Sequence, residues 1–359
     1  MFSRGYILKT SWLVALALAV AYPLKAAENL DQLVAGAKKE RELVFVGPTS
    51  TFGGRKAFSE LAAVFNKKYG LNARIRFTEG PPYPSMAARV ITELKAGRES
   101  STDFYNGYTA QFALLHKEKA LEKVNWSGIF PWITKEMEIF PGEGVLTDTD
   151  IHGPIWNPNF IPKEKAPKRY EDLVDPRLSP TWAGKLAIPP YTTWLTDLSL
   201  IWGEEKVKDF TRKLVPLSGG RIGYGEEERI VSGEFPIMAD MGSALSRMWE
   251  WQSKGAPLVA VPGSTPVLSL YILLGVPKNS AHPNLARLFV GFMVSKEGQA
   301  IMEKHAFRSS HLVEGTIAAK YVRDNRLELL DPSKVKEFYL KEDASGLQLR
   351  KELDQLLKR

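Results

Sequence analysis

Short apolar strand patterns alternate with amphipathic helix patterns along this chain, and that alternation limits its possible folds most strongly. Residues 43–46 form a compact apolar run, and the apolar positions between residues 58 and 69 then recur every three or four residues. A strand pattern at 73–77 and a helix pattern at 86–94 follow. This order predicts an α/β fold in which helices cover a mostly parallel sheet.

A second series of the same kind begins at residue 186, beyond an irregular stretch at 123–149 and a proline-dense one at 161–190. Its strand patterns include 186–188 and 268–276, and a long helix pattern occupies 285–303, with residues 295–299 either late in the helix or at a break in it. A chain of 359 residues is long enough for about two domains. Because no flexible linker separates the two series, we expect the chain to cross between the domains more than once.

The first 27 residues have the features of an export signal. Arg4 and Lys9 precede an uncharged, mostly apolar run at 11–22, and small residues then allow cleavage after Ala26 or Ala27. The alternative is an uncleaved membrane anchor, but the apolar run is shorter than the ~20 residues that span a bilayer. We therefore expect a protein that is secreted to the periplasm.

Composition and motifs exclude several kinds of chemistry. The chain has no cysteine, so thiol nucleophiles, thiolate metal sites and disulfides are excluded. Its net charge of +7 comes from basic residues that are interleaved with acidic ones, which does not predict a nucleic-acid surface. The sequence contains no HExxH, P-loop or GxSxG motif. We expect neither an enzyme nor a bound cofactor.

Three segments carry a resemblance to a known family. They are KRYEDLVDPRLSPTWAGKLAIPP at 168–190, IVSGEFPIM at 230–238 and the stretch from GVPKNSAHPN to MEKHAF at 275–307. In order and spacing they resemble the extracellular solute-binding proteins of ABC transporters. These are type II periplasmic binding proteins, in the group that includes binders of iron, thiamine, polyamines and phosphonates.

The resemblance implies two α/β lobes joined by two hinge crossings. Residues 28–150 with 266–359 would form lobe one, and 151–265 would form lobe two. It further implies a monomer that closes on a small polar ligand and delivers it to a membrane permease. One alternative is a sensor subunit that serves a signalling receptor. Another is binding of Fe(III) or a cation without the adjacent tyrosine pair of the iron binders, since Met241-Gly242 aligns with that pair.

In such a fold the ligand is expected at strand ends and helix N-termini, where free N–H groups favour polar or anionic groups. Hydroxyl-rich turns follow predicted strands in both lobes, and helix capping is an equally good explanation for several of them. The candidate ligand-binding residues are Thr49, Ser50, Thr51, Asn106, Tyr108, Tyr191, Thr192, Thr193, Tyr224, Asp240 and Ser243. The hydroxyl groups favour an organic or phosphorylated anion.

Overall fold

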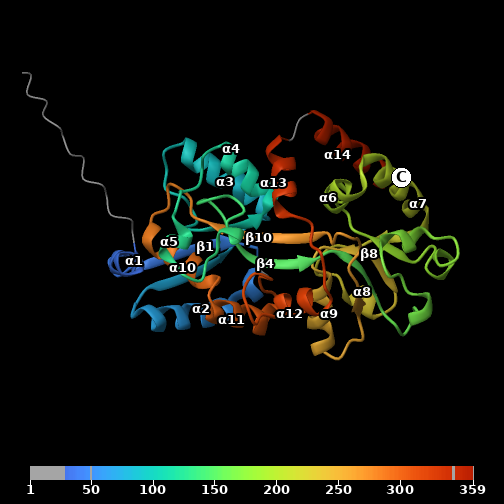
Figure 1. Ribbon diagram of the computed structural model, residues 1–359, viewed down its shortest axis with the longest axis horizontal. Helices are drawn as coiled ribbons and strands as arrows, with labels where there is room; N and C mark the ends of the chain where they lie inside the picture. The colour runs from blue at the N-terminus through green and yellow to red at the C-terminus, as the bar shows by residue number, and fades with distance from the viewer. Residues whose placement is uncertain (1–28, 49–50, 342–343, 359) are drawn as a thin grey trace, which may run out of the picture.

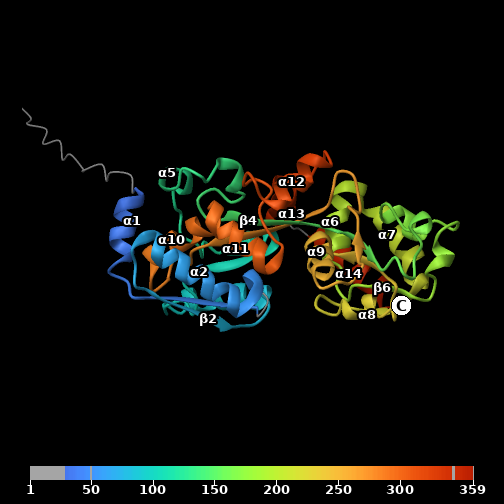
Figure 2. The same cartoon turned by 90° about the horizontal axis from the view of Figure 1, so that it is seen from below.

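The structure is a computed structural model that describes residues 29–48, 51–341 and 344–358. Two lobes lie side by side, and the strands β4 (Val145–Ile151) and β10 (Ser269–Gly275) run toward the region where they meet (Figures 1 and 2). The predicted α/β fold in two lobes is confirmed. The predicted export signal lies outside the described residues, within which no helix has both the length and the apolar character to span a membrane.

Lobe one contains two small sheets. The strands β1 (Glu42–Gly47) and β2 (Arg74–Glu79) pair in parallel. The second sheet has the order β3 (Tyr105–Tyr108), β10, β4, and both of its pairings are antiparallel. The helices of this lobe are α1 (Leu30–Ala37), α2 (Gly54–Tyr69), α3 (Tyr83–Lys95), α4 (Thr109–Lys117), α5 (Trp126–Ile129), α10 (Pro283–Met293) and α11 (Lys296–Ala306). The helix α12 (Ile317–Asp324) contacts lobe two, where its Tyr321 packs on Trp249.

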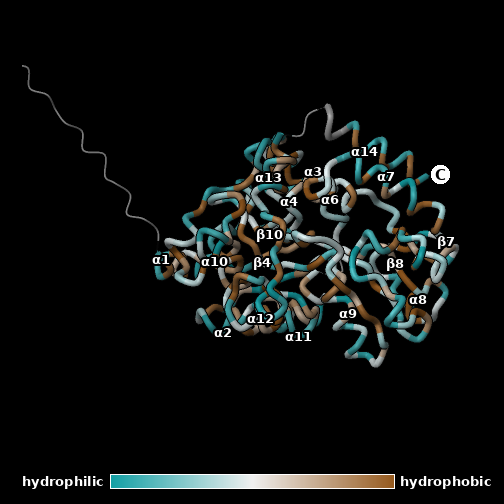
Figure 3. The backbone as a smooth tube through the Cα atoms, turned by 45° about the vertical axis from the view of Figure 1, so that its right-hand side comes forward, coloured by the Kyte–Doolittle hydropathy of each residue, from teal (hydrophilic) through white to brown (hydrophobic). Residues whose placement is uncertain are grey.

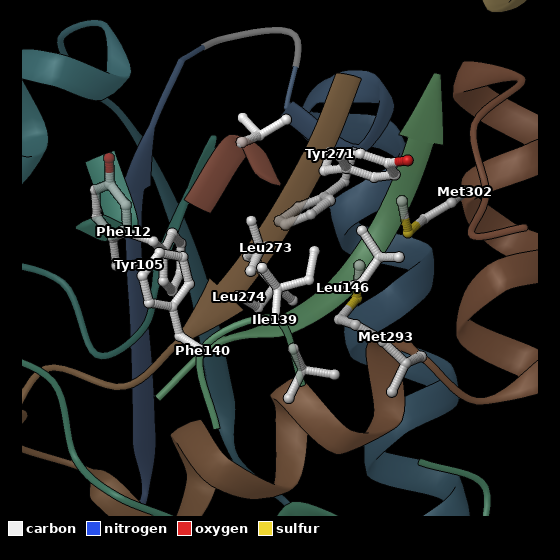
Figure 4. Packing of buried hydrophobic residues seen from close by; sticks show 14 of the residues in the cluster. Tyr105, Phe112, Ile139, Phe140, Leu146, Tyr271, Leu273, Leu274, Met293 and Met302 are labelled. Atoms are coloured by element: carbon white, nitrogen blue, oxygen red, sulfur yellow. The ribbon is translucent and has the colours of Figure 1, made fainter. Parts of the chain in front are cut away.

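Aromatic side chains hold the core of lobe one together. Phe45 of β1 stacks on Phe104 with ring centroids 4.5 Å apart and on Phe77 of β2 at 5.5 Å. The α2 residue Phe58 packs on the same ring from the helix side. A neighbouring part of the core, shown in Figure 4, joins the β10 residue Leu273 to residues of α4 and β4. Such pairs stabilise the fold through buried area and offset ring contacts.

Lobe two is built on one five-stranded sheet. Its order is β7 (Ser218–Arg221), β6 (Leu186–Ile188), β8 (Ile237–Met241), β5 (Gly153–Trp156), β9 (Val259–Ala260). The helices α6 (Thr193–Trp202), α7 (Glu204–Leu214), α8 (Glu228–Val231) and α9 (Ala244–Ser253) flank it. β6 pairs in parallel with β7 and β8, whereas β5 is antiparallel to both of its neighbours. The sheets are therefore more mixed than the sequence predicts, because strands next to the crossings run in opposite directions.

The two crossings between the lobes pass very close to each other. One follows β4 and leads into β5 at Gly153, and the other leads from β9 to β10. A side chain on Gly153 would place its Cβ only 1.8 Å from the carbonyl oxygen of Val261. Glycine is thus required at this point, where one backbone lies directly against another.

The structure decides one sequence-based alternative about elements and corrects another expectation. The break considered within the helix pattern at 285–303 is present: α10 ends at Met293 and α11 begins at Lys296, because Ser295 caps α11 by accepting a hydrogen bond from the N–H of Gly298. The stretch 123–149, predicted to be irregular, contains the first part of β4, and every residue of that strand is buried. Its threonine and aspartate side chains hide the strand from a pattern based on hydrophobicity.

The C-terminal helices lie on different lobes. α13 (Pro332–Lys341) packs on α4 of lobe one, whereas α14 (Ala344–Leu357) packs on α6 and α7 of lobe two (Figure 1). The apolar side of α14, with Leu349 and Leu353 buried, faces these helices, and its hydropathy alternates along the tube in Figure 3. The division predicted from the sequence assigns 266–359 to lobe one. We propose instead that α14 is part of lobe two.

Candidate functional site

A cavity of about 600 Å³ opens between the lobes at the ends of the strands. Strand β3 and the turns that follow β1 and β2 supply its walls from lobe one, and turns that follow β6 and β7 supply them from lobe two. We call it the larger cavity. Its lining residues are Pro48, Thr51, Phe52, Gly80, Pro82, Tyr83, Pro84, Asn106, Tyr108, Asp148, Tyr191, Tyr224, Ile272 and Arg308.

Arg308 is the cationic side chain of this cavity, and the end of α11 positions it. Phe307, just before it, adopts a left-handed conformation with φ of 55° and ends the helix. The chain then runs beside β4, where the N–H of Thr149 donates to the carbonyl oxygen of Ser309 over 2.9 Å. Asp148 and Asp150 are two residues apart on β4, so both point to the same face of the strand, toward Arg308.

The guanidinium of Arg308 joins the two lobes. It lies 3.7 Å from the carboxylate of Asp148 and 3.9 Å from that of Asp150. Across the cleft, its Nη2 donates to the Oγ of Ser243 over 2.7 Å and to the hydroxyl of Tyr224 over 3.2 Å. The two carboxylate distances exceed hydrogen-bond length, so the N–H groups on Nη1 and Nε keep donor capacity for a ligand.

Burial changes the ionisation of the acids beside Arg308. Burial raises the pKa of Asp148 to about 7, although the positive charge of Arg308 opposes that rise. Burial likewise raises the pKa of Asp150, against the opposing charge of Arg308 and a hydrogen bond from Ser246. The Oδ1 of Asp148 and the Oδ1 of Asn106 are both buried without a hydrogen-bond partner. Both atoms therefore remain able to accept hydrogen bonds at the cavity wall.

Tyr224 lies between two guanidinium groups. Arg247 lies 5.0 Å and Arg308 lies 5.7 Å from the centre of its ring, which are cation–π distances. Arg247 is itself held by the fully buried carboxylate of Glu227 at 2.5 Å. Although 42% of Tyr224 is exposed, its ring is thus aligned at the mouth of the cleft by charges from both lobes.

A second cavity of about 320 Å³ adjoins the first, and we call it the smaller cavity. The two share the side chains of Tyr108, Tyr191 and Tyr224, which form what we call the tyrosine wall. Tyr108 is braced by an edge contact with Tyr83 at 4.9 Å. The other residues that line the smaller cavity are Pro84, Thr109, Ala110, Gln111, His152, Thr193, Asp197, Gly242, Ser243, Ser269, Leu270, Tyr271, Val335 and Tyr339.

The structure brings most of the predicted ligand-binding residues to these cavities. Those that line one or both are Thr51, Asn106, Tyr108, Tyr191, Thr193, Tyr224 and Ser243. Thr49 and Ser50 lie outside the described residues. The turns that follow strands in the two lobes therefore face a common space, although they are far apart in the sequence.

Two predicted residues have other partners. Thr192 donates from its Oγ1 to the Oδ1 of Asp354 on α14 over 2.8 Å. Asp240 is fully buried, where it accepts a hydrogen bond from the hydroxyl of Tyr170 and lies 3.1 Å from the Nδ1 of His152. Because these partners occupy both side chains, the structure assigns them to the packing of lobe two.

Sequence patterns did not identify the charged residues that matter most here. Asp148 and Asp150 lie in β4, which was not predicted. Arg308 lies 160 residues after Asp148, and its only local signal is the end of a helix.

The described part of the chain contains no group of three or more His, Asp or Glu side chains placed to hold a metal ion. Asp148 lies 3.7 Å from a guanidinium nitrogen of Arg308, Asp240 lies 3.1 Å from the Nδ1 of His152, and Asp197 accepts a hydrogen bond from Tyr339.

Comparison with known proteins agrees with this fold. The sequence pattern of bacterial extracellular solute-binding proteins matches residues 60–308, whereas no curated protein sequence matches the chain. Iron-bound HitA from Pseudomonas aeruginosa is similar in structure, with a TM-score of 0.67 and 19% identity over 87% of this chain and 99% of that one.

Two structures from Agrobacterium tumefaciens are similar as well. The substrate-binding protein of an ABC transporter has a TM-score of 0.69 and 16% identity, over 90% of this chain and 97% of that one. AgtB in complex with agropinic acid has a TM-score of 0.65 and 17% identity, over 89% of this chain and 99% of that one. At these identities the likeness shows the fold.

Proposed function

This chain belongs to the bacterial extracellular solute-binding protein family, and we propose on that premise that it captures a small anionic ligand between its lobes and delivers it to an ABC permease. Members of this family bind solutes outside the cytoplasm, which supports a periplasmic location. The ligand would occupy the larger cavity.

The observation that carries the proposal is the position of Arg308. Its guanidinium lies at the wall of the larger cavity, contacts both lobes and keeps N–H donors for an acidic group. Arginine is well suited to bind carboxylate or phosphate, because its planar fork of donors matches two oxygens at once. Among the similar structures, AgtB is in complex with an acid by name, agropinic acid.

Contact with both lobes also supports a capture mechanism. Ligand-driven closure is a population shift, so a ligand closes the cleft only if it binds the closed form better than the open one. Thr51 and Asn106 from lobe one and Tyr191 and Tyr224 from lobe two line the same cavity. A ligand there gains contacts on both sides only when the lobes approach.

A thermal-shift screen of the purified protein tests the proposal. Carboxylates, phosphate, phosphonates and sugar phosphates are compared with thiamine, polyamines and Fe(III), since a ligand that binds the native state raises the melting temperature. We expect stabilisation by one or more of the anions. The Arg308→Met variant should lose this stabilisation, whereas Arg177→Met, which changes an arginine that is 87% exposed, should keep it.

The outcomes separate the parts of the proposal. Stabilisation by Fe(III) or an organic cation alone would show binding but contradict the anionic ligand. An anion that binds equally well to Arg308→Met would place the site elsewhere. Delivery to a permease is tested with the permease reconstituted in vesicles: the liganded protein should stimulate its ATPase, and no stimulation would contradict the importer role.

A further inference from the structure

The smaller cavity contains an acceptor and an ionisable ring nitrogen that have no partner in the part of the chain that the structure describes. The Oδ1 of Asp197 accepts a hydrogen bond from the hydroxyl of Tyr339 over 2.7 Å, and no described residue donates to its Oδ2. The Nδ1 of His152 lies 3.1 Å from Asp240, and its Nε2 likewise has no hydrogen-bond partner among the described residues. Both side chains line the cavity.

The protonation states of this pair select the kind of group that fits. Burial opposes a charge on His152, but the carboxylate of Asp240 outweighs burial and raises the pKa of the imidazole. Burial raises the pKa of Asp197 to about 6, so this carboxylate is mostly ionised at neutral pH. A hydroxyl can donate to Asp197 and can pair with the Nε2 of His152 in either state of the ring.

Charged groups fit this cavity less well. An ammonium group would attract Asp197 but would meet the protonated form of His152, and these two side chains influence each other's ionisation. An anionic group would meet the carboxylate of Asp197 in a buried space, where like charges are costly. A neutral group with hydroxyls satisfies both side chains without either conflict.

The rest of the wall supplies flat, apolar contact area. The rings of Tyr191, Tyr271 and Tyr339 line the smaller cavity together with Leu270 and Val335. A group with an apolar face and a polar edge can pack on such rings while its hydroxyls reach the polar side chains. Polyols and sugar rings have this combination of surfaces.

We infer that the smaller cavity is a subsite for an uncharged, hydroxyl-bearing part of the ligand, so that the ligand is a polyhydroxylated acid whose acidic group binds Arg308. This inference rests on the proposed function, because the acidic group anchors the ligand in the larger cavity. The tyrosine wall, shared by both cavities, would contact the portion that joins the two ends.

Calorimetric titration of matched compounds tests the inference. Acetate is compared with gluconate, and inorganic phosphate with glucose 6-phosphate, so that each pair differs by a polyol. We expect at least one hydroxylated member to bind ~10-fold or more tighter than its partner, because a hydrogen bond to a charged group contributes about that factor. Glycine betaine, an acid with a cationic end, should gain nothing over acetate.

Two variants connect the gain to the subsite. Asp197→Asn should reduce the affinity for the hydroxylated acid by ~10-fold or more and leave acetate or phosphate within ~2-fold, because a site built for a hydroxyl loses that discrimination when its partner changes. Asp354→Asn is the matched control, since Asp354 also accepts a hydrogen bond near α6 but lines neither cavity. It should change neither affinity.

The results distinguish this inference from the proposed function. If both members of each pair bind through Arg308 with equal affinity, or if glycine betaine binds best, the subsite inference is wrong and the anion site stands. Equal losses for both members in Asp197→Asn would also overturn it, because they would indicate a general structural effect. Binding of no anion at all, or binding that does not depend on Arg308, would instead contradict the proposed function.

Discussion

The buried carboxyl of Asp148 should make the stability of this protein fall as the pH rises, and Asp148→Asn should remove that fall. Asp148 is 3% exposed, and burial beside Arg308 and Asp150 leaves its pKa at about 7 instead of 3.8. Each pKa unit corresponds to about 1.4 kcal/mol of differential stability. The rise in pKa therefore corresponds to ~4 kcal/mol, as an order of magnitude.

The sign follows from proton binding. Between the unfolded pKa near 3.8 and the folded pKa near 7, the native state holds a proton that the unfolded state has lost. The contribution of the protonated Asp148 carboxyl to the free energy of unfolding is therefore fully present below pH ~4. It decreases as the pH rises and is lost above pH ~7. An asparagine does not titrate, so the variant should gain stability relative to the native sequence over that interval.

Urea unfolding of both proteins, followed by the fluorescence of the nine tryptophans, measures the difference. The free energy of unfolding of Asp148→Asn minus that of the native sequence should increase by ~2–3 kcal/mol between about pH 5 and pH 8. Asp209→Asn is the control, because Asp209 is half-exposed in a surface pair with Lys213. Its free energy of unfolding relative to the native sequence should change by less than ~0.5 kcal/mol over the same pH interval. A difference for Asp148→Asn that does not change with pH would refute the reasoning.

Two further predictions concern stability at the hinge and at the C-terminus. Gly153→Ala should lower the free energy of unfolding in urea by ~3 kcal/mol or more, because the added Cβ would overlap the carbonyl oxygen of Val261. Gly184→Ala is the control: its φ is 73° but the space around it is open, so it should lower the free energy of unfolding by only ~1 kcal/mol. Equal losses would contradict the close approach at Gly153. A double-mutant cycle of Thr192→Val and Asp354→Ala should give a coupling of ~1 kcal/mol, since the two side chains share one hydrogen bond, and a coupling near zero would contradict it.

The sequence predicted those helices and strands whose apolar residues recur with the period of one buried face. The helix predicted at 86–94 lies within α3, and the strand at 186–188 coincides with β6, since their apolar residues form the buried face. β4 was missed because it is buried yet rich in threonine and aspartate, which replace apolar contacts by hydrogen bonds and ion pairs. The position of α14 was missed because its apolar face does not specify which lobe covers it.

The sequence predicted the candidate-site residues that lie in hydroxyl-rich turns after strands. Turns after β1 and β6 carried Thr51 and Tyr191 to the cavity, because strand ends in such folds face a common cleft, whereas Asn106 lies within β3 itself. Arg308 was not predictable, since its place depends on the left-handed residue before it and on a strand 160 residues earlier in the chain. Asp240 carried the right chemistry for a ligand contact, but tertiary packing assigned it to His152 and Tyr170.

The position of α14 affects the order in which the lobes can be completed during folding. The core of lobe two is encoded in the middle of the chain, yet α6 and α7 are covered by α14, whose Glu352 pairs with Lys208 at 2.7 Å. A chain that has folded only as far as α9 would expose the apolar surfaces that α14 later covers. Lobe two therefore reaches its final burial only after the last helix has docked.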